Sequence, residues 1–597
     1  MGWSSRLFCL ALIYAVTGQA RECKCTPGES CWPSDSDWAA FNATVDGRLL
    51  RTKLPASVCY PGSADYDEAT CESVIANWND PPFHSKDPVS NFLPSWANNS
   101  CNPIYEDGTS TAGDTLAGSR GCTLGKYPPY SVNATTAEHI QAAVRFAKER
   151  NLRLNVKNTG HNPKSLAFGS LSIWTHNMKD VEYIESFEPT CTTNTSVKYR
   201  LRSVPQKAFT VGPGIQDGEI YHAAAKLNLA VVGGGSSDVG LVGWSTGGGH
   251  GWLTSEFGMG ADSIIQAEVV LPSGDIVVAN ECQNSDLFWA IRGGGGGTFG
   301  VITKVTVKAH PMPQTTTWSF SVTKSTTDTS AWWKLVARIH AEFPALKAGG
   351  MQGYYSILGP PASSALTFGG TFNVYNKPNG TIEPLIKPIL SLLDEASETA
   401  TYSSSISWAA TWIEFFDSQG EANSAGVGGA ATTSRLLPAA SLTKDIDYLA
   451  QVLELVSPAD DPTLGLLNPT IAGCLIASTT PVDNALNPAW RDTTVHLNVA
   501  AIWSDATPYT QAWITTDTMT NVRGAALRSL APNTGVYYNE ADDFEPDWQK
   551  SMWGENYARL KVIKLKYDPT HLQWCRRCVG SESWFELEDG RLCQAVQ

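Results

Sequence analysis

Helix and strand patterns alternate along the central part of the chain, from about residue 116 to 312. After the capping box Thr135-x-x-Glu138, residues 140–147 carry apolar side chains at helical spacing. Residues 152–156 then alternate between apolar and polar, as a half-buried strand does. The pattern predicts a helix and then a strand, with a loop directly after the strand.

Further strands follow along the chain. Residues 268–271 and 275–279 flank the turn Pro272-Ser273-Gly274 and predict a β-hairpin, and residues 301–307 predict another strand. Residues 313–530 form a second unit that lacks glycine-rich loops and mixes strands with helices. Its strand-like runs are 315–322, 365–374 and 493–503, and its helix-like runs are 331–343 and 382–398.

The two ends of the chain have other patterns. Residues 1–20 place Arg6 before the apolar run 7–16 and end in small residues, which predicts a secretory signal peptide. Residues 21–115 are rich in Cys, Pro, Ser and Asp and show little periodicity. Residues 531–597 are aromatic, and we expect them to return to the first unit.

Length and charge narrow the possible functions. A chain of 597 residues is too long for one core, and its 42% hydrophobic and 17% charged residues are those of a folded protein. The net charge of −15 disfavours binding to nucleic acid or to an anionic membrane surface. After residue 20 no apolar run is long enough to span a bilayer. We expect a secreted monomer that acts on a small molecule.

The cysteines and glycosylation sequons agree with secretion. Of 14 cysteines, 13 remain if Cys9 leaves with the signal peptide, so at least one thiol stays free or pairs between chains. Cys575-x-x-Cys578 lacks the βαβ setting of a redox motif and predicts a structural disulfide. Seven cysteines belong to a stapled N-terminal extension: Cys23, Cys25, Cys31, Cys59, Cys71, Cys101 and Cys122. The sequons begin at Asn42, Asn98, Asn133, Asn194 and Asn379.

Glycine clusters carry the clearest chemical signal. Residues 233–240 and 243–251 expose bare backbone, whose N–H groups are able to close on a pyrophosphate. A third cluster contains the spacing G-x-G-x-x-G at Gly295, Gly297 and Gly300, but a strand follows it where a dinucleotide fold needs a helix. No zinc-spaced Cys/His set is present in the sequence, and we expect no metal site.

Several long motifs together resemble one known family. They are residues 121–132, the pair Gly160-His161 after a strand, residues 286–303, and the C-terminal runs 537–542, 556–560 and 566–569. In this order they resemble the berberine-bridge-enzyme-like oxidoreductases of the vanillyl-alcohol oxidase and p-cresol methylhydroxylase superfamily, especially secreted fungal members.

The resemblance implies an α+β fold and an FAD cofactor. Residues 116–312 would form an FAD-binding domain of two α/β lobes, and residues 313–530 a substrate domain with an antiparallel sheet flanked by helices. Residues 531–597 would return to the flavin. His161 would be linked covalently to the flavin 8α-methyl carbon. The other residues expected to contact FAD are Asn158, Thr159, Gly160, Asn162, Gly235, Ser236, Ser237, Asp238, Gly240, Gly243, Ser245, Gly248, Gly249, Gly251, Val301, Ile302 and Asn539.

Departures from the family pattern refine this expectation. Many relatives make a second flavin bond from a cysteine at the position of Ser236, so we predict a single covalent link. Residues 162–165 replace the Ser-Tyr of sugar-oxidising relatives, which disfavours a carbohydrate substrate. In the plant branch a small residue at the position of Val239 accompanies oxygen access, and valine favours an oxidase.

The base that takes the substrate's hydroxyl proton has several candidates. Residues 494–503 alternate and place His496 and Asn498 on one face of a strand. Relatives carry Gln or Glu where this chain has Asn498. Tyr537 and Glu540 lie in the motif that resembles the stretch reaching the flavin, and we rank them before His496. Candidates for lining the pocket are Trp408, Trp412 and Arg435, although core packing is the better interpretation of Trp412.

The sequence therefore predicts a secreted FAD-dependent oxidase that takes a hydride from an alcohol-type substrate and passes electrons to O2, giving H2O2. Two alternatives remain open. One is a secondary-metabolite tailoring enzyme that performs an oxidative cyclisation or dehydrogenation. The other is a non-catalytic flavin-carrying binding protein.

Overall fold

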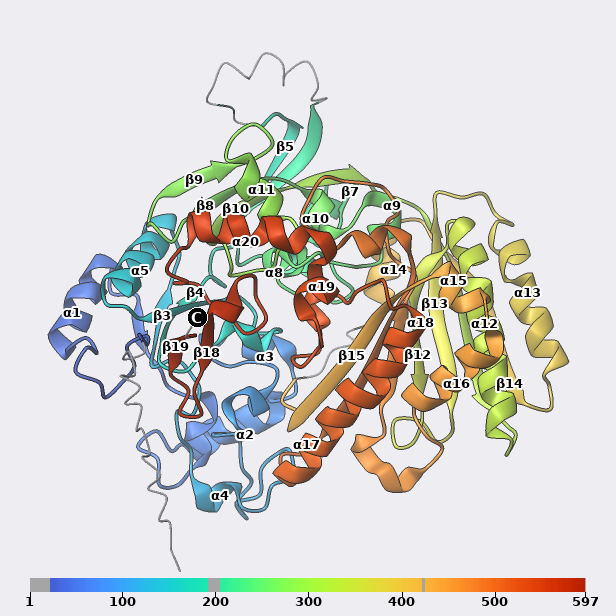
Figure 1. Ribbon diagram of the computed structural model, residues 1–597, viewed down its shortest axis with the longest axis horizontal. Coiled ribbons are helices and arrows are strands. Elements are labelled where there is room, and N and C mark those ends of the chain that lie inside the picture. The colour runs from blue at the N-terminus through green and yellow to red at the C-terminus, as the bar shows by residue number, and fades with distance from the viewer. Residues whose placement is uncertain (1–21, 190, 192–204, 421–424, 596–597) are drawn as a thin grey trace, which may run out of the picture.

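The computed structural model describes residues 22–189, 191, 205–420 and 425–595, whose strands form four sheets (Figure 1). The predicted signal peptide and the sequon at Asn194 lie outside these residues. Asn98 and Asn379 are exposed, while Asn42 and Asn133 are half-buried, and glycosylation at these positions stays a prediction.

The first sheet has the order β1-β2-β4-β3. The strand predicted from the sequence is its β3, and the predicted helix precedes β3 in the chain. Its strands are β1 (Leu49–Arg51), β2 (Tyr130–Asn133), β4 (Ser170–Trp174) and β3 (Arg153–Lys157). Helix α5 (Ala137–Glu149) buries Ile140, Ala143, Val144 and Ala147 as its spacing predicts.

The predicted start of α5 was wrong by one residue. Thr136, with an extended backbone, is the N-cap, and its hydroxyl accepts from the His139 N–H at 3.3 Å. Thr135 instead contacts the imidazole of His139. Two adjacent threonines make the cap ambiguous in the sequence, because either side chain has the required oxygen.

The second sheet is antiparallel, with the order β5-β6-β10-β8-β9 and β7 paired with β10. The predicted hairpin is confirmed as β8 and β9. The strands are β5 (Val181–Phe187), β6 (Gln206–Val211), β7 (Leu229–Val231), β8 (Ile264–Val270), β9 (Ile276–Ala279) and β10 (Val301–Pro311). The helices beside them are α7 (Asp217–Ala225), α8 (Leu241–Thr246), α9 (Thr254–Phe257), α10 (Gly260–Ser263) and α11 (Ser285–Ile291).

The third sheet has seven antiparallel strands in the order β14-β11-β13-β12-β16-β17-β15. Helices pack on it around one apolar core. The strands are β11 (Thr315–Lys324), β12 (Gln352–Leu358), β13 (Thr367–Tyr375), β14 (Ala400–Ala409), β15 (Gly429–Pro438), β16 (Thr470–Cys474) and β17 (Thr493–Trp503). The helices are α12 (Thr329–Ala348), α13 (Ile382–Glu395), α14 (Trp412–Ser418), α15 (Ala439–Thr443), α16 (Ile446–Val456), α17 (Tyr509–Thr518) and α18 (Gly524–Leu530).

Strand β17 alternates as predicted. Val495, Leu497 and Val499 face the apolar core, which leaves His496 and Asn498 on the opposite face. These sheets and helices confirm the α+β architecture and the antiparallel sheet flanked by helices.

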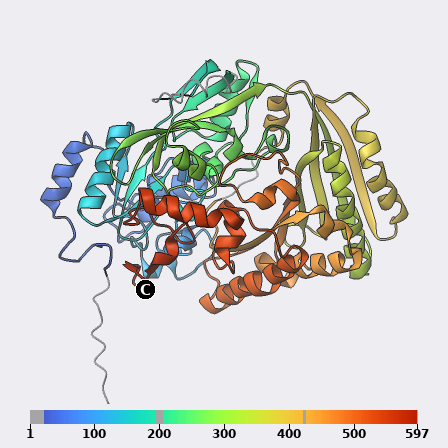
Figure 2. The same cartoon turned by 45° about the horizontal axis from the view of Figure 1, so that its top comes forward.

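The chain returns to the first two sheets at its C-terminal end. Helix α19 (Trp548–Trp553), helix α20 (Tyr557–Tyr567) and the hairpin of β18 (Trp584–Glu586) and β19 (Leu592–Gln594) form this segment. In Figures 1 and 2 it lies, in red, beside the first two sheets. No helix of the described residues has both the length and the apolar character to cross a membrane.

Disulfides staple the N-terminal extension, as predicted. Its helices are α1 (Asp35–Thr44), α2 (Glu68–Asn77), α3 (Pro81–Ser85) and α4 (Ala117–Arg120). Cys23 pairs with Cys593, so one bond joins the two ends of the described chain. Among the described residues Cys474 is a free, buried thiol. The other disulfides are Cys25–Cys31, Cys59–Cys71, Cys101–Cys122, Cys191–Cys282 and Cys575–Cys578.

Candidate active site

A cavity of about 360 Å³ lies where the first two sheets meet the C-terminal segment. The predicted residues that line it are Asn158, Thr159, Gly160, His161, Asn162, Gly240, Gly243, Val301, Ile302, Tyr537, Asn539 and Glu540. Residues not assigned to the site from the sequence also line it, including Thr175, Pro213, Gln573, Trp574 and the third glycine cluster.

Bare backbone forms one wall of this cavity. Residues 295–297 and Gly243 line it, and a Cβ added at Gly297 or Gly243 would meet no atom within 4 Å. Gly295 has a φ of +99°, and a Cβ there would lie 2.8 Å from the Tyr538 ring, so only glycine fits. A wall of exposed backbone amides next to an open space fits the long, flat shape and the pyrophosphate of FAD.

His161 enters this cavity from the loop after β3. Gly160 makes the turn with a φ of +95°, and a Cβ added there would lie 2.9 Å from the Ser90 carbonyl oxygen. The Nε2 of His161 lies 2.7 Å from Asp238 Oδ2. Burial tends to raise the pKa of Asp238, but the imidazole lowers it overall, so the carboxylate stays ionised. With Nε2–H donating to Asp238, Nδ1 keeps its lone pair for a covalent bond.

A buried lysine anchors the same loop. The Nζ of Lys157 donates to the carbonyl oxygens of His84, Asp87 and Thr159 at 3.1, 2.7 and 3.3 Å. Its side chain has no exposure, and burial lowers the pKa of Lys157 to about 7. Lys157 thus ties the loop of His161 to the N-terminal extension.

Other predicted FAD contacts lie outside the cavity wall. These residues are Gly235, Ser236, Ser237, Asp238, Ser245, Gly248, Gly249 and Gly251. A Cβ at Gly251 would overlap the Gly233 carbonyl oxygen, and one at Gly249 would press on Trp244. These two glycines let neighbouring backbone segments pack closely, and their contact with FAD stays a prediction.

A cluster of polar side chains reaches the cavity through Glu540. Glu540 lines the cavity, with Oε1 2.9 Å from His250 Nε2 and Oε2 accepting from Asn498 Nδ2 at 3.1 Å. The other ring nitrogen of His250 lies 3.0 Å from the Tyr354 hydroxyl. Burial tends to raise the pKa of Glu540, but His250, His496 and Asn498 lower it to about 2. Glu540 is therefore a carboxylate at any ordinary pH.

His496 and Tyr537 stand beside this carboxylate. His496 is 2% exposed, and its Nδ1 lies 3.9 Å from Cys474 Sγ. Its Nε2 is buried without a hydrogen-bond partner. Burial lowers the pKa of His496 to about 4 and raises the pKa of Tyr537, so both side chains are neutral at pH 7.

His250 and Tyr354 are the residues of this cluster that the sequence analysis missed. His250 lies inside the second glycine cluster, and a histidine between glycines was an available signal. Tyr354 lies on β12, where nothing in the sequence distinguishes it from a core tyrosine.

Two predicted pocket residues lie elsewhere. Trp408 is 58% exposed on the edge strand β14. Arg435 is buried and donates to the carbonyl oxygens of Ala531 and Thr534. Trp412 is 1% exposed and packs edge-on against Tyr221, which confirms that it belongs to the core.

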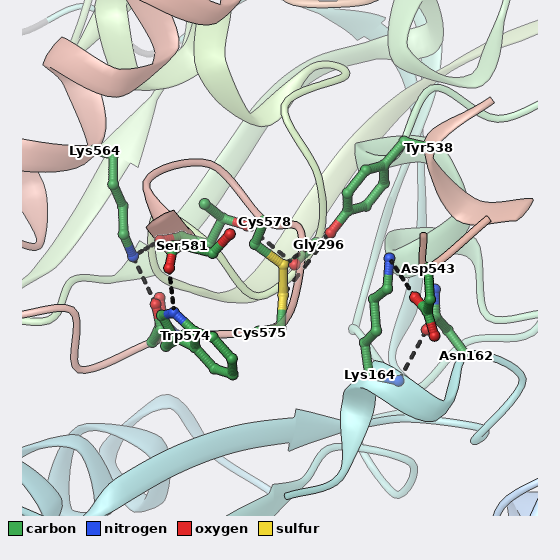
Figure 3. The surroundings of a disulfide bond; sticks show 12 residues. Asn162, Lys164, Gly296, Tyr538, Asp543, Lys564, Trp574, Cys575, Cys578 and Ser581 are labelled. Carbon is green, nitrogen blue, oxygen red and sulfur yellow. Dashed lines mark hydrogen bonds and ion pairs between the residues drawn. A yellow bond between two sulfur atoms is a disulfide. The ribbon is translucent and has the colours of Figure 1, made fainter. Parts of the chain in front are cut away.

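A disulfide stands at the end of the cavity wall (Figure 3). Cys575 lines the cavity, and the Tyr538 hydroxyl lies 3.0 Å from Cys578 Sγ. Figure 3 places this disulfide beside Gly296, opposite Lys164 and Asp543. The Cys575–Cys578 bond closes a turn of the C-terminal segment next to the glycine wall, and its structural role stays a prediction.

Comparisons with known proteins agree with this geometry. Residues 128–280 match the family model of an FAD binding domain, and residues 536–577 match that of berberine and berberine-like proteins. The FAD-linked oxidoreductase ZEB1 of Gibberella zeae is 31% identical over 98% of this chain and 97% of its own length. The bifunctional decalin synthase calF of Penicillium decumbens is 31% identical over the whole of both chains.

A solved structure extends the similarity to the fold. The VAO-type flavoprotein MtVAO713 from Myceliophthora thermophila C1 superposes with a TM-score of 0.87 at 31% identity. The match covers 96% of this chain and all of that one.

Proposed function

Because this chain belongs to the berberine-bridge-enzyme-like family of FAD-linked oxidoreductases, we propose that it oxidises an alcohol-type small molecule and uses O2 as the electron acceptor. One observation carries the proposal. An ionised carboxylate, Glu540, lines the same cavity as the glycine wall that suits FAD.

The glycine wall and the His161 loop would hold the cofactor. Bound FAD would supply the redox chemistry, since a flavin accepts a hydride from an alcohol carbon and passes electrons to O2, giving H2O2. His161 would carry the covalent link, with Asp238 accepting its Nε2 proton and keeping Nδ1 nucleophilic. Serine at position 236 cannot form a thioether, which supports a single link.

Glu540 is the base that the geometry favours. A base must be ionised before it takes the hydroxyl proton, and the pKa of Glu540 is about 2 while that of Tyr537 is raised. Tyr537 also lines the cavity, and its hydroxyl accepts from Asn539 Nδ2 at 2.8 Å, so it is suited to orient the substrate. His496 lies behind Glu540 and does not line the cavity.

We also propose that the protein is a secreted, glycosylated monomer. The apolar run in residues 1–20, the sequons and the disulfides support secretion, because disulfides persist in oxidising compartments. Val239 lines the cavity, and a small residue at this position accompanies oxygen access in the plant branch of the family, which supports an oxidase.

A tailoring reaction on a secondary metabolite is the second candidate. The full-length similarity to a protein named bifunctional decalin synthase favours it. In that case the same base and cofactor wall would serve an oxidative cyclisation or dehydrogenation, and the two candidates share the hydride-transfer step.

Anaerobic mixing with candidate substrates tests the proposal. The purified yellow protein should bleach with a substrate among alcohols, phenols, sugars or hydroxylated polyketides, then recolour in air and release peroxide. Bleaching without recolouring would exclude the oxidase and leave a dehydrogenase. Flavin should stay with the polypeptide after acid precipitation, and complete release of the colour would contradict the covalent link.

A further inference from the structure

Three side chains beside the cavity offer metal-binding atoms to one point. They are His250, His496 and Glu540, and their potential ligand atoms all lie within 4.8 Å of one another. They come from three distant segments: the loop after α8, strand β17, and the C-terminal segment. Two imidazoles and one carboxylate are a donor set that suits Zn²⁺ and similar transition metals rather than Mg²⁺ or Ca²⁺.

A buried orphan nitrogen points to a ligand. His496 is 2% exposed, and its Nε2 has no hydrogen-bond partner. Its Nδ1 lies beside the thiol of Cys474, which leaves Nε2 as the nitrogen available to the cluster. A buried polar atom without a partner is costly in a folded protein, and a bound ion would satisfy it.

Each of the three side chains also contacts a polar partner outside the proposed ligand set. The Tyr354 hydroxyl lies 3.0 Å from His250 Nδ1, Cys474 Sγ lies 3.9 Å from His496 Nδ1, and Asn498 donates to Glu540 Oε2. In metal sites the ligands are oriented in this way by partners on their far atoms. The contact between His250 Nε2 and Glu540 Oε1 is then the hydrogen bond that an ion would replace.

Aromatic rings surround the cluster and limit access of water. The rings of Trp490 and Tyr537 lie 5.5 and 6.0 Å from that of His496, and the Tyr537 ring lies 4.9 Å from that of His250. An apolar shell strengthens the attraction between an ion and its ligands, because the local dielectric constant is low.

The geometry points to a divalent transition-metal site, of the Zn²⁺ class, formed by His250, His496 and Glu540 at the wall of the cofactor cavity. Three protein ligands leave a further position open, as in catalytic zinc sites. Its role rests on the proposed function: the open position would take the hydroxyl oxygen of the substrate. Coordination would lower the pKa of that hydroxyl, and Glu540 Oε2, the carboxylate oxygen on the Asn498 side, would take the proton before hydride transfer.

Zn²⁺ titration of the flavin-loaded protein tests the site directly. The protein is dialysed against dipicolinate, freed of the chelator and titrated with Zn²⁺ alone by calorimetry. We expect one Zn²⁺ per chain. Co²⁺ in its place should give absorption bands at wavelengths longer than those of the flavin, with the intensity typical of nitrogen and oxygen ligands. Absence of saturable Zn²⁺ binding would overturn the site.

His496→Gln is the decisive variant, since it removes the ligand with the orphan nitrogen. We expect Zn²⁺ binding to weaken by more than about 100-fold, beyond what loss of an outer-shell partner causes, with the flavin content and Tm retained. Asn498→Leu removes only the hydrogen bond to Glu540 and should weaken binding by about 10- to 100-fold. His222→Gln, at an exposed histidine beside Asp417, is the matched control and should bind as the parent does.

If His496→Gln lowers the Tm, His250→Gln provides the second test of the same ligand set. Binding unchanged in both histidine variants would overturn the site. The outcomes also separate the two proposals: a protein that bleaches with substrate but binds no Zn²⁺ refutes the metal site alone. A protein that binds Zn²⁺ at these residues but is bleached by no substrate keeps the site and refutes the proposed function.

Discussion

The two walls of the cavity are built on opposite principles. The cofactor wall is backbone: residues 295–297 and the turn at Gly160 expose peptide groups, and the surroundings of Gly160 and Gly295 leave no room for a Cβ. The other wall depends on side chains from three separate segments, because Glu540 lines the cavity while His250 and Asn498 contact its carboxylate from behind. The first wall fits FAD, a cofactor that many proteins share. The second wall determines which substrate proton is removed.

The two walls therefore differ in how many amino-acid substitutions they tolerate. A backbone wall tolerates few substitutions, because a Cβ at Gly295 would strike the Tyr538 ring. Side chains on the other wall can be exchanged one at a time without altering the fold. We therefore expect relatives to share the cofactor and to differ in the reaction.

The largest effect should follow a change in the side-chain wall. Glu540→Gln removes the proposed base and should slow flavin reduction by about 10²- to 10⁴-fold, while the FAD content stays the same. Stopped-flow absorbance under anaerobic conditions measures the rate. The control is Glu555→Gln, an exposed glutamate of the same C-terminal segment. A rate within a factor of two of the parent would remove Glu540 from the mechanism.

The second prediction concerns Lys157, which holds the loop of the cofactor wall in place. Lys157→Met leaves the carbonyl oxygens of His84, Asp87 and Thr159 without their buried donor. We expect the free energy of unfolding to fall by about 3 kcal/mol, with less FAD bound. Chemical denaturation measures the change. Lys53→Met, at an exposed lysine paired with Asp65, should change stability by less than about 0.5 kcal/mol. Equal stability of the two variants would show that Lys157 does not anchor the loop.

A smaller effect is expected from the hydrogen bond between Asp238 and His161, which leaves His161 Nδ1 free for covalent flavin attachment. Asp238→Asn removes the negative charge 2.7 Å from Nε2 and should slow covalent flavin attachment about 10- to 100-fold, since a charged hydrogen bond contributes about 1.5–3 kcal/mol. Fluorescence of the denatured polypeptide over time after adding FAD measures attachment. Asp275→Asn, in the exposed turn of the β8–β9 hairpin, is the control. Attachment at the parent rate would show that the carboxylate has no part in it.

The smallest effect concerns acid pH. A carboxylate base works above its own pKa and is lost as the pH falls through that value. Because His250, His496 and Asn498 hold the pKa of Glu540 at about 2, flavin reduction at about pH 4 should keep most of its pH 7 rate. A pH profile of the reduction rate measures this. A decline centred near the ordinary glutamate value of 4.5 would mean that these partners do not stabilise the charge.

The sequence predicted the backbone wall better than the side-chain wall, for a physical reason. Glycines that shape a wall are close in sequence, so the Gly160-His161 turn and the third cluster could be noticed before the fold was known. The third cluster is followed by strand β10, as predicted, and not by the helix that a dinucleotide-fold motif needs. Gly249 and Gly251 looked identical to cavity glycines, because sequence does not distinguish backbone packing from ligand contact.

The side-chain wall depends on long-range contacts that no local pattern contains. Alternation placed His496 and Asn498 on the correct face of β17, and the C-terminal motif singled out Glu540. Neither pattern could bring His250 to within 2.9 Å of Glu540, 290 residues away in the sequence. The prediction that Trp408 lines the pocket was wrong. An aromatic residue on an edge strand cannot be distinguished from one on an inner strand until the strand order is known.

The bond between Cys23 and Cys593 makes the described polypeptide a covalent ring of 570 residue steps. A single proteolytic cut in any surface loop of that ring opens it without releasing a fragment, and the cut chain migrates as one species until it is reduced. The ring can close only after Cys593 has been synthesised, and closing it requires the two ends of the described chain to lie near each other.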